Sequence, residues 1–420
     1  MPKKHLLPLL ILLFLAACSP REEYDLSFMV FGDPAELAAY ETLVDTFHQE
    51  HPDIRVQLRH IPAQGDYRRR LATDFSGGAP PDVMLLNYRR FALFADQGGL
   101  EPLGGYLDDS PLIAERDFFE PAIASFYYEG QLWCVPQNVS SLVVYYNKAL
   151  FDAAGIPYPA DEWTRDDFVT IARALTVDED GDGRPEQYGA GIAANLFRLA
   201  PFIWQNGGQL VDDAAHPTRL MLDSPEALAA MQWLIDLQTK EGVVPDAAAE
   251  AVESSERRFL NGRLALYFNS RRGVPTYRTT APFDWDVLPL PAGGIPSGIL
   301  HSDGYCMAAR TANKAAAWTF IEFANSVQGQ EIVAASGRTV PSLTAVANSS
   351  IFLDPAQPPA NSRVYVDTVP QLGHVPIIKT WAIIEETTSN EIENAFYGRI
   401  SVEEAARKAI EQTTPYFVTD

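Results

Sequence analysis

The pattern of apolar and polar residues changes its period several times near the N-terminus, which predicts strands and helices in turn. Residues 25–32 and 81–87 are largely apolar runs that end in polar residues or glycine, as is typical of buried strands. Residues 35–52 have apolar side chains at helical spacing, residues 53–61 alternate as a strand does, and residues 66–75 have a helical pattern. Strands that alternate with helices predict a parallel sheet covered by helices.

The rest of the chain continues in the same way, so the predicted fold class is α/β, with sheets flanked by helices. Residues 132–156 are predicted as strand, polar turn, strand and helix. Further helices are predicted at 165–175, 224–240, 253–260, 313–326, 381–397 and 402–412, and further strands at 262–270, 283–291 and 304–309. A chain of 420 residues has room for two or three domains or lobes.

Polar residues follow several of the apolar strands, at the point where each strand ends. In an open parallel sheet, ligands bind beyond the carboxyl ends of the strands. The residues at these positions are Asp33, Gln64, Asn87 and Asn138. We therefore expect all four to line a ligand site.

The first residues have the features of a secretory leader, which we place at residues 1–17. Two lysines precede the apolar run at 6–15, and small residues precede Cys18. The run is shorter than the about 20 apolar residues that a membrane span needs. The residues "LAAC" resemble a bacterial lipobox, in which Cys18 is lipidated and becomes the mature N-terminus. The alternative is a chance cysteine at the cleavage site.

The charge balance argues against one class of partner. Acidic residues outnumber basic ones by 55 to 32, and the formal net charge is −23. A surface of this kind repels phosphate backbones, so we do not expect a nucleic acid partner.

Residues 132–168, "LWCVPQNVSSLVVYYNKALFDAAGIPYPADEWTRDDF", resemble the extracellular solute-binding proteins of ABC importers. The most similar group is the sugar-binding family that includes maltose-binding protein. One departure from the family pattern is that Trp163 precedes Thr164 rather than following it. Weaker matches, such as "WQNGGQL" and "FLNGRLALYFN", follow in the same order as in the family.

The resemblance implies two α/β lobes of the periplasmic-binding-protein type II fold, with a ligand cleft between them. One lobe is expected at 24–142 plus 303–350, and the other at 143–302 plus 351–420. It also implies an exported monomer that delivers its solute to the permease subunits of an importer. The protein would be anchored by lipid on the outer face of the cytoplasmic membrane or in the periplasm, and would be no enzyme.

The resemblance further suggests which aromatic side chains face the cleft. Trp204 and Trp381 match positions that commonly line it, where a ring stacks on a sugar. Core packing is the alternative for each of them. For Trp233 and Trp318, which lie within amphipathic helices, core packing is the expectation.

Polar candidates complete the predicted ligand site. They are Asn269, Arg272, Ser302, Asp303, Gly304 and Arg338. The family often has glycine or an aromatic residue near Arg272, so the arginine is a departure. It could bind sugar hydroxyls or an anionic group, or it could be solvated at the surface. The loop residues around position 303 and Arg338 could equally serve only in turns.

Two further features leave alternatives open. Asp178, Asp180 and Asp182 have the spacing that begins an EF-hand calcium loop, and Glu186 stands at loop position 9. Position 12 is Gly189 instead of glutamate, so the loop is either a calcium site or a solvated turn. The resemblance places Cys134 and Cys306 on strands near the crossings between the lobes, where they either pair or stay free.

The sequence thus predicts a lipid-anchored receptor that captures a carbohydrate, a di- or oligosaccharide, and requires no cofactor. The alternatives are a receptor for an anionic solute such as glycerol phosphate or a uronate, and an exported glycoside hydrolase. The motifs of zinc proteases, α/β-hydrolases and phosphate-binding loops are absent from the chain. A hydrolase needs only two carboxylates, which composition alone does not exclude.

Overall fold

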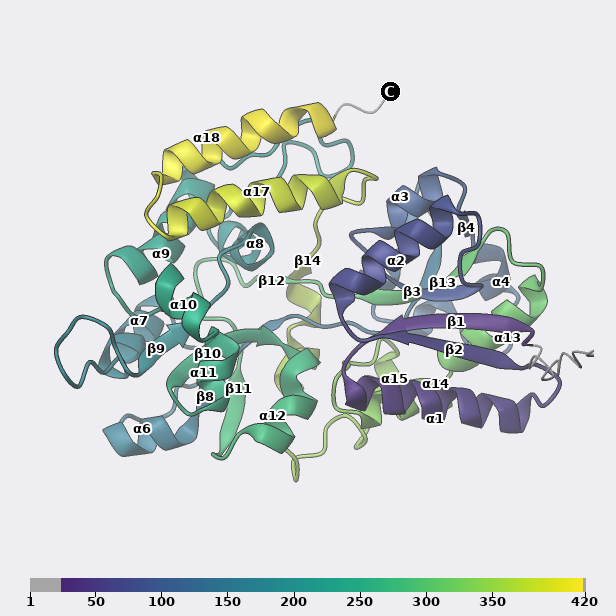
Figure 1. The fold of residues 1–420 in the computed structure, drawn as a ribbon, viewed down its shortest axis with the longest axis horizontal. Helices are drawn as coiled ribbons and strands as arrows, with labels where there is room; N and C mark the ends of the chain where they lie inside the picture. The colour runs from purple at the N-terminus through teal and green to yellow at the C-terminus, as the bar shows by residue number, and fades with distance from the viewer. Residues whose placement is uncertain (1–23, 418–420) are drawn as a thin grey trace, which may run out of the picture.

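The computed structural model describes residues 24–417, so the predicted leader at 1–17 and Cys18 lie outside the described residues. Within the described part, no helix is long and apolar enough to cross a membrane. Two sheets, each with its own helices, make up the two halves of the molecule (Figure 1).

The larger sheet has the strand order β2-β1-β3-β13-β4, and β7 pairs with β13. Its strands are β1 (Leu26–Phe31), β2 (Val56–Ile61), β3 (Val83–Asn87), β4 (Leu100–Glu101), β7 (Cys134–Pro136) and β13 (Asp303–Ala308). β1 runs parallel to β2 and β3, as predicted, but β13 runs antiparallel to β3, β4 and β7. The sheet is therefore mixed, because β13 belongs to a segment that returns to this sheet after the chain has passed through the other half.

Helices cover both faces of this sheet, with α2 and α3 on one side and α1 and α14 on the other (Figure 1). The helices of this half are α1 (Pro34–Glu50), α2 (Gln64–Ser76), α3 (Phe91–Asp96), α4 (Gly104–Asp108), α5 (Glu120–Ala124), α13 (Lys314–Ala324), α14 (Val327–Ala335) and α15 (Thr344–Ala347). Phe28 of β1 packs against Phe320 of α13, and Phe320 packs edge-on against Phe47 of α1. These rings bury the apolar faces that the sequence pattern predicts.

The smaller sheet has the order β11-β8-β10-β9. Its strands are β8 (Leu142–Asn147), β9 (Tyr188–Gly191), β10 (Leu264–Ser270) and β11 (Trp285–Leu288). β8 runs antiparallel to β10 and β11, and β9 runs parallel to β10. Two-stranded ribbons join β5 (Tyr127–Tyr128) to β6 (Gln131–Leu132) and β12 (Gly298–Ile299) to β14 (Leu372–Gly373).

The C-terminal helices α17 and α18 pack on each other and on α9, and α17 also packs on α8, so the end of the chain belongs to the second half (Figure 1). The helices of this half are α6 (Lys148–Ala154), α7 (Arg165–Ala174), α8 (Leu196–Gln205), α9 (Pro225–Thr239), α10 (Ala247–Val252), α11 (Ser255–Leu260), α12 (Val274–Thr280), α16 (Arg363–Asp367), α17 (Trp381–Phe396) and α18 (Val402–Thr413). Trp233 of α9 and Trp318 of α13 pack against the core, as expected.

Extended segments connect the two halves and pair with one another where they cross. Asn138 forms an isolated bridge with Pro341, and Ser140 forms one with His301. The strands of the larger sheet fall within the residues assigned to the first lobe, and β8 begins at Leu142. The lobe boundaries themselves stay a prediction.

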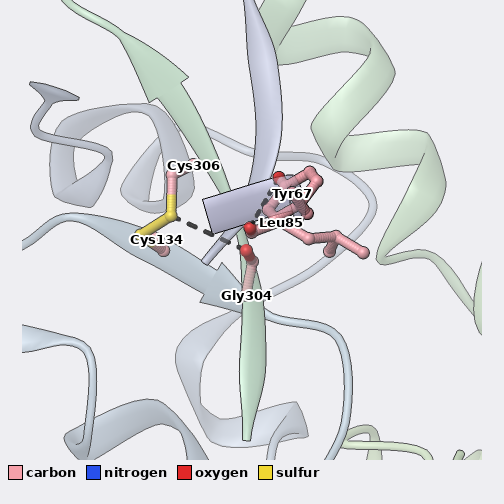
Figure 2. The surroundings of a disulfide bond; sticks show 5 residues. All are labelled: Tyr67, Leu85, Cys134, Gly304 and Cys306. Carbon is pink, nitrogen blue, oxygen red and sulfur yellow. Dashed lines mark hydrogen bonds between the residues drawn. A yellow bond between two sulfur atoms is a disulfide. The ribbon is translucent and has the colours of Figure 1, made fainter. Parts of the chain in front are cut away.

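A disulfide joins Cys134 of β7 to Cys306 of β13, with Cα atoms 4.4 Å apart (Figure 2). Of the two alternatives that the sequence left open for these cysteines, pairing is the one found in the structure. The bond links residues 172 positions apart in the sequence and fixes the partner of the strand that the chain adds last to this sheet.

Candidate functional site

A cavity of about 630 Å³ lies between the two halves and is lined by residues of both. This volume is within the range of about 300–1,000 Å³ that small-molecule sites occupy. Of the predicted ligand residues, the cavity is lined by Asp33, Gln64, Asn87, Asn138, Arg272, Asp303 and Arg338. The sequence-based rule of polar residues at strand ends therefore identified much of this wall.

The first wall is built from the ends of strands and the starts of helices. Asp33 follows β1 and caps α1, with its Oδ1 accepting a hydrogen bond of 3.0 Å from the backbone N–H of Glu36. Gln64 begins α2 directly after β2. Asn87 ends β3 and pairs in register with Asp303 of β13, and its Nδ2 donates to Asp303 Oδ1 at 3.1 Å. Carboxylate and amide groups of this kind offer both acceptors and donors to hydroxyl groups.

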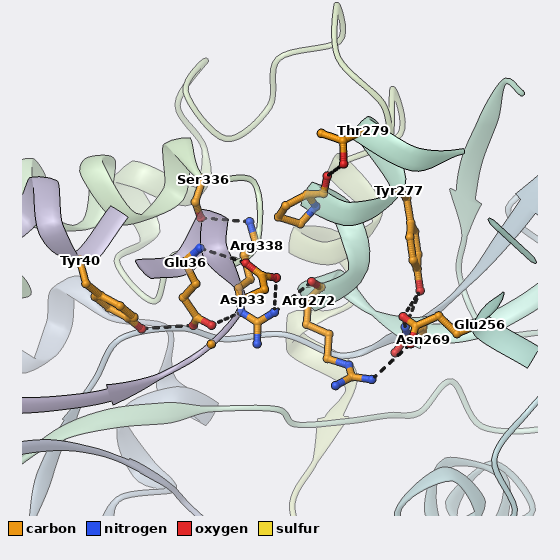
Figure 3. Close-up of polar contacts among 12 residues, drawn as sticks. Asp33, Glu36, Tyr40, Glu256, Asn269, Arg272, Tyr277, Thr279, Ser336 and Arg338 are labelled. Atoms are coloured by element: carbon orange, nitrogen blue, oxygen red, sulfur yellow. Dashed lines mark hydrogen bonds and ion pairs between the residues drawn. The ribbon is translucent and has the colours of Figure 1, made fainter. Parts of the chain in front are cut away.

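Arg338, from the loop after α14, contacts both halves of the molecule. Its Nη1 donates to Asp33 Oδ2 at 2.9 Å and to the backbone carbonyl of Arg272 at 3.2 Å, and its Nε forms an ion pair with Glu36 (Figure 3). The side chain of Arg338 is only 14% exposed. It therefore holds the loop of one lobe against the other at the edge of the cavity.

Buried side chains hold Glu36 in place through a series of hydrogen bonds. Tyr40 Oη donates to Glu36 Oε1 at 3.2 Å, and Gln137 Nε2 donates to Tyr40 Oη at 2.7 Å and to Tyr305 Oη at 3.0 Å. Burial raises the pKa of Glu36 to about 8, although the Arg338 guanidinium acts in the opposite direction. Burial also raises the pKa of Asp303. Burial of the Glu36 carboxyl group therefore costs stability, which the ion pair with Arg338 partly offsets.

Replacement Glu36→Gln should change the pH dependence of stability. The folded-state pKa of Glu36 lies above its unfolded value, so the folded protein binds more protons between about pH 4.5 and pH 8. The contribution of Glu36 to stability is therefore present at low pH and is lost as the pH rises through this window. Thermal melts at pH 5 and pH 8 should show that the variant gains melting temperature over the wild type as the pH rises. A difference that stays constant with pH would contradict the shifted pKa.

The second wall comes from the other half of the molecule. Phe197 and Arg198 lie in the first turn of α8, and Glu256 lies in α11. Arg272 follows β10, and its guanidinium is 4.0 Å from Glu256 (Figure 3). Glu256 also accepts a hydrogen bond of 2.8 Å from Tyr277. Both walls are thus polar and charged.

Neither of the tryptophans expected at the cleft lines the cavity. Trp381 is fully buried at the start of α17, where its Nε1 donates to Glu385 Oε2 at 3.2 Å. Trp204 packs against Gly373, where an added Cβ would lie 2.8 Å from the indole ring. Core packing, the alternative considered for both, describes the position of Trp381, whereas Trp204 is half-buried against the edge of the core. The aromatic rings that line the cavity are those of Phe31 and Phe197.

Three further predicted residues lie behind the wall rather than on it. Asn269 is fully buried, and its Nδ2 donates to Tyr277 Oη at 2.7 Å. Ser302 is also fully buried and donates to the carbonyl of Asn138 at 2.7 Å. At Gly304, an added Cβ would lie 2.8 Å from the ring of Phe126, so the glycine allows this ring to pack against β13. These residues position the wall residues instead of lining the cavity.

Several residues that line the cavity were not among those predicted, because their sequence signals are weaker. They are Glu36, Arg89, Phe197, Arg198 and Glu256. Two of them had a usable signal. Glu36 is one turn after a predicted strand end, and Arg198 interrupts the otherwise apolar run "LFRLAPFIWQ". A charged residue within such a run is buried only where it faces a cavity or a partner.

The acidic loop after α7 lies away from the cavity. Asp178, Asp180 and Asp182 are exposed, and each offers a carboxylate oxygen within 4.8 Å of the others. The Asp178 carboxylate accepts hydrogen bonds from the N–H groups of Gly181 and Gly183, at 2.8 and 2.9 Å. Glu186 accepts one of 2.8 Å from the N–H of residue 179. This arrangement suits either a calcium loop or a hydrogen-bonded turn.

Calcium binding by this loop stays a prediction, with a direct test. A site with no bidentate glutamate at position 12 should be weak, with a Kd of about 10⁻⁴–10⁻³ M. We expect millimolar calcium to raise the melting temperature, magnesium to do so less, and Asp180→Asn to remove the calcium effect. A melting temperature that does not respond to calcium would identify the loop as a turn.

Comparison with known proteins agrees with this architecture. The family model described as bacterial extracellular solute-binding protein matches residues 32–331. The solved structure of an ABC substrate-binding protein from Listeria monocytogenes in complex with cycloalternan is similar, with a TM-score of 0.86 and 25% identity, over 94% of this chain and 99% of that chain.

Two further relatives match over a smaller share of the chain. The maltotriose-binding protein of Pyrococcus abyssi is 23% identical over 69% of this chain and 60% of its own length. The erythritol/L-threitol-binding protein of Mycolicibacterium smegmatis is 27% identical over 68% of this chain and 63% of its own length. The family match covers more than half of the chain, and the fold and the cavity between the lobes agree with it. The chain belongs to the bacterial extracellular solute-binding proteins and has their two-lobed fold.

Proposed function

We propose that this protein captures a carbohydrate, a di- or oligosaccharide, and delivers it to the permease subunits of an ABC importer. The observation that carries the proposal is the cavity between the lobes, whose two walls both present hydrogen-bonding side chains. Asp33, Asn87 and Asp303 on one wall and Glu256 on the other are suited to hydroxyl groups, which both donate and accept hydrogen bonds.

The relatives support a polyhydroxyl ligand. One is solved in complex with cycloalternan, and the other two are named for maltotriose and for erythritol or L-threitol; all of these ligands are rich in hydroxyl groups. A buried polar group left unpaired costs about 1–3 kcal/mol, so the pattern of hydroxyl groups should set the specificity. Because the ligand touches both lobes, it binds their closed arrangement better and favours closure.

A thermal-shift screen over neutral, acidic and phosphorylated sugars and polyols tests this function. A ligand at 100 times its Kd adds about 2.7 kcal/mol of stability, which gives a clear rise in melting temperature. Peptides and metal ions serve as comparison classes. A rise with peptides or metals alone would contradict the carbohydrate assignment.

The protein acts as a receptor and not as an enzyme in this proposal. The competing function is glycoside hydrolysis, because a glycosidase needs two carboxyl groups and several carboxyl groups line the cavity. Incubation with each sugar that binds, followed by chromatography, separates the two functions. A receptor returns the sugar unchanged, whereas shortened products would identify a hydrolase.

We further propose that the protein is an exported monomer, held at the membrane by lipid on Cys18. The "LAAC" motif behind an apolar leader supports this anchor. Each buried methylene of a lipid chain contributes about 0.8 kcal/mol, so several chains on one cysteine give stable attachment. Mass spectrometry of the membrane fraction should find a lipidated N-terminal cysteine. A freely secreted product with another N-terminus would contradict the anchor.

A further inference from the structure

The cationic side chains that line the cavity differ in how their charges are compensated. Arg338 pairs with Asp33 and Glu36, and Arg89 pairs with Glu385 at 2.5 Å. These two arginines are therefore occupied by carboxylates of the protein itself.

Arg198 is different, because its side chain has no hydrogen bond or ion pair within residues 24–417. It lines the cavity from the first turn of α8, and its Nε is buried without a partner. Burial, together with the neighbouring Arg272 and Arg89, lowers the pKa of Arg198 to about 10, so its guanidinium group is still charged at neutral pH. Arg198 is half-buried, and a cation partly removed from water without a counter-charge is costly, so a charged group of a ligand is the expected compensation.

Two other groups beside Arg198 also lack strong partners. Arg272 lines the same cavity, and its only ion pair in the described chain is the one of 4.0 Å with Glu256, at 57% side-chain exposure. His301 stacks on Phe197 with ring centroids 4.5 Å apart, and its Nε2 is buried without a partner. Burial and the nearby arginines hold the pKa of His301 well below its usual value, so its ring is neutral and has one N–H to donate.

The opposite wall does not present the full negative charge that its residues suggest. Burial raises the pKa of Glu36 to about 8 and also raises that of Asp303, and Arg338 pairs with Asp33. On the α8 side of the cavity, the carboxylate of Glu256 accepts a hydrogen bond from Tyr277 and lies 4.0 Å from the Arg272 guanidinium, so its charge is partly compensated. The first wall remains suited to hydroxyl groups.

We propose that the ligand is a carbohydrate that carries an oxyanion, and that Arg198 binds this oxyanion together with Arg272 and His301. Asn87 and Asp303 bind the hydroxyl groups of the same molecule from the other lobe. This inference rests on the proposed function as a carbohydrate receptor and specifies its ligand class. The oxyanion is a carboxylate in a uronate and a phosphate in a sugar or polyol phosphate.

Calorimetric titration with matched probes tests the inference on the full-length mature protein. The probes are galactose, galacturonate and galactose 6-phosphate, the same three forms of glucose, and glycerol with glycerol 3-phosphate. Because charge-assisted hydrogen bonds are stronger than neutral ones, we expect an anionic probe to bind at least about tenfold tighter than its neutral counterpart. The preferred anion then identifies the source as a carboxylate or a phosphate.

Substitutions at Arg198 locate the anion. Arg198→Gln should lower the ratio of anionic to neutral affinity by at least about tenfold, and Arg198→Lys should restore part of it. The Arg198→Gln variant should melt no lower than the wild type without ligand, because it breaks no side-chain hydrogen bond or ion pair in the described part of the chain. Arg272→Gln, at a more exposed position, should lower the same ratio even where a change at Arg198 impairs folding. Arg407→Gln on the exposed face of α18 is the matched control.

The outcomes separate the inference from the proposed function. Neutral probes that bind as tightly as their anionic counterparts would overturn the inference and leave the carbohydrate receptor standing. An affinity ratio unchanged in both Arg198→Gln and Arg272→Gln would also overturn it. If no neutral or anionic carbohydrate binds in the thermal-shift screen, di- and oligosaccharides included, the proposed function fails together with the inference.

Discussion

Replacement Asp303→Asn should weaken carbohydrate binding by about 10- to 100-fold, or about 1.4–2.8 kcal/mol, because a carboxylate accepts stronger hydrogen bonds from hydroxyl groups than an amide does. Asp303 starts β13 and lines the cavity beside Asn87. Calorimetric titration of wild type and variant with the best ligand from the thermal-shift screen measures the change.

The substitution should affect binding without loosening the fold. The asparagine Oδ1 can still accept the hydrogen bond from Asn87 Nδ2, and burial already raises the pKa of the Asp303 carboxyl group. We therefore expect the melting temperature without ligand to stay the same or to rise. Asp53→Asn, which removes the same charge from an exposed turn, is the matched control. Equal ligand affinity in both variants and the wild type would show that Asp303 does not bind the ligand.

Loss of the Cys134–Cys306 disulfide should lower the free energy of unfolding by about 2–5 kcal/mol. The bond closes a loop with a sequence separation of 172 residues, so it restricts the unfolded chain strongly. Guanidinium unfolding of the Cys134→Ala/Cys306→Ala double variant should show a lower midpoint than the wild type.

Reduction with dithiothreitol distinguishes the stability contributed by the disulfide bond from the stability contributed by packing of the sulfur atoms. The reduced wild type retains both sulfur atoms, so it should lose most of the same stability, whereas the double variant should not respond to the reductant. Ligand affinity should change little, since both cysteines are fully buried in the sheet of one lobe and neither lines the cavity. Identical midpoints with and without reductant would contradict a stabilising bond.

The sequence predicted those helices and strands whose apolar periodicity can be recognised from neighbouring residues alone. β1, α1, β2 and β3 lie where the apolar periodicity places them, and the polar residues after these strands line the cavity. This works because the carboxyl ends of neighbouring parallel strands share one edge of a sheet. β13 was predicted as a strand, but its antiparallel direction depends on a return of the chain from the other lobe, which no local pattern encodes.

The remaining part of the site depends on tertiary packing. Trp381 was expected at the cleft, but the packing of α17 against α8 and α9 turns its indole ring into the core. Arg198 was not predicted as a site residue, because its helix has the sequence of a core helix. Only the first turn of this helix faces the cavity. Which side of a helix is buried is decided by its neighbours, and the sequence of the helix alone does not name them.

Small-angle X-ray scattering with and without ligand tests most directly whether a carbohydrate binds between the lobes. A ligand that contacts both walls of the cavity favours the closed arrangement, so a saturating amount should lower the radius of gyration of the wild type. At the same ligand concentration, the weaker binding of Asp303→Asn should give a smaller change. A radius of gyration that stays constant while calorimetry shows full saturation would contradict binding between the lobes.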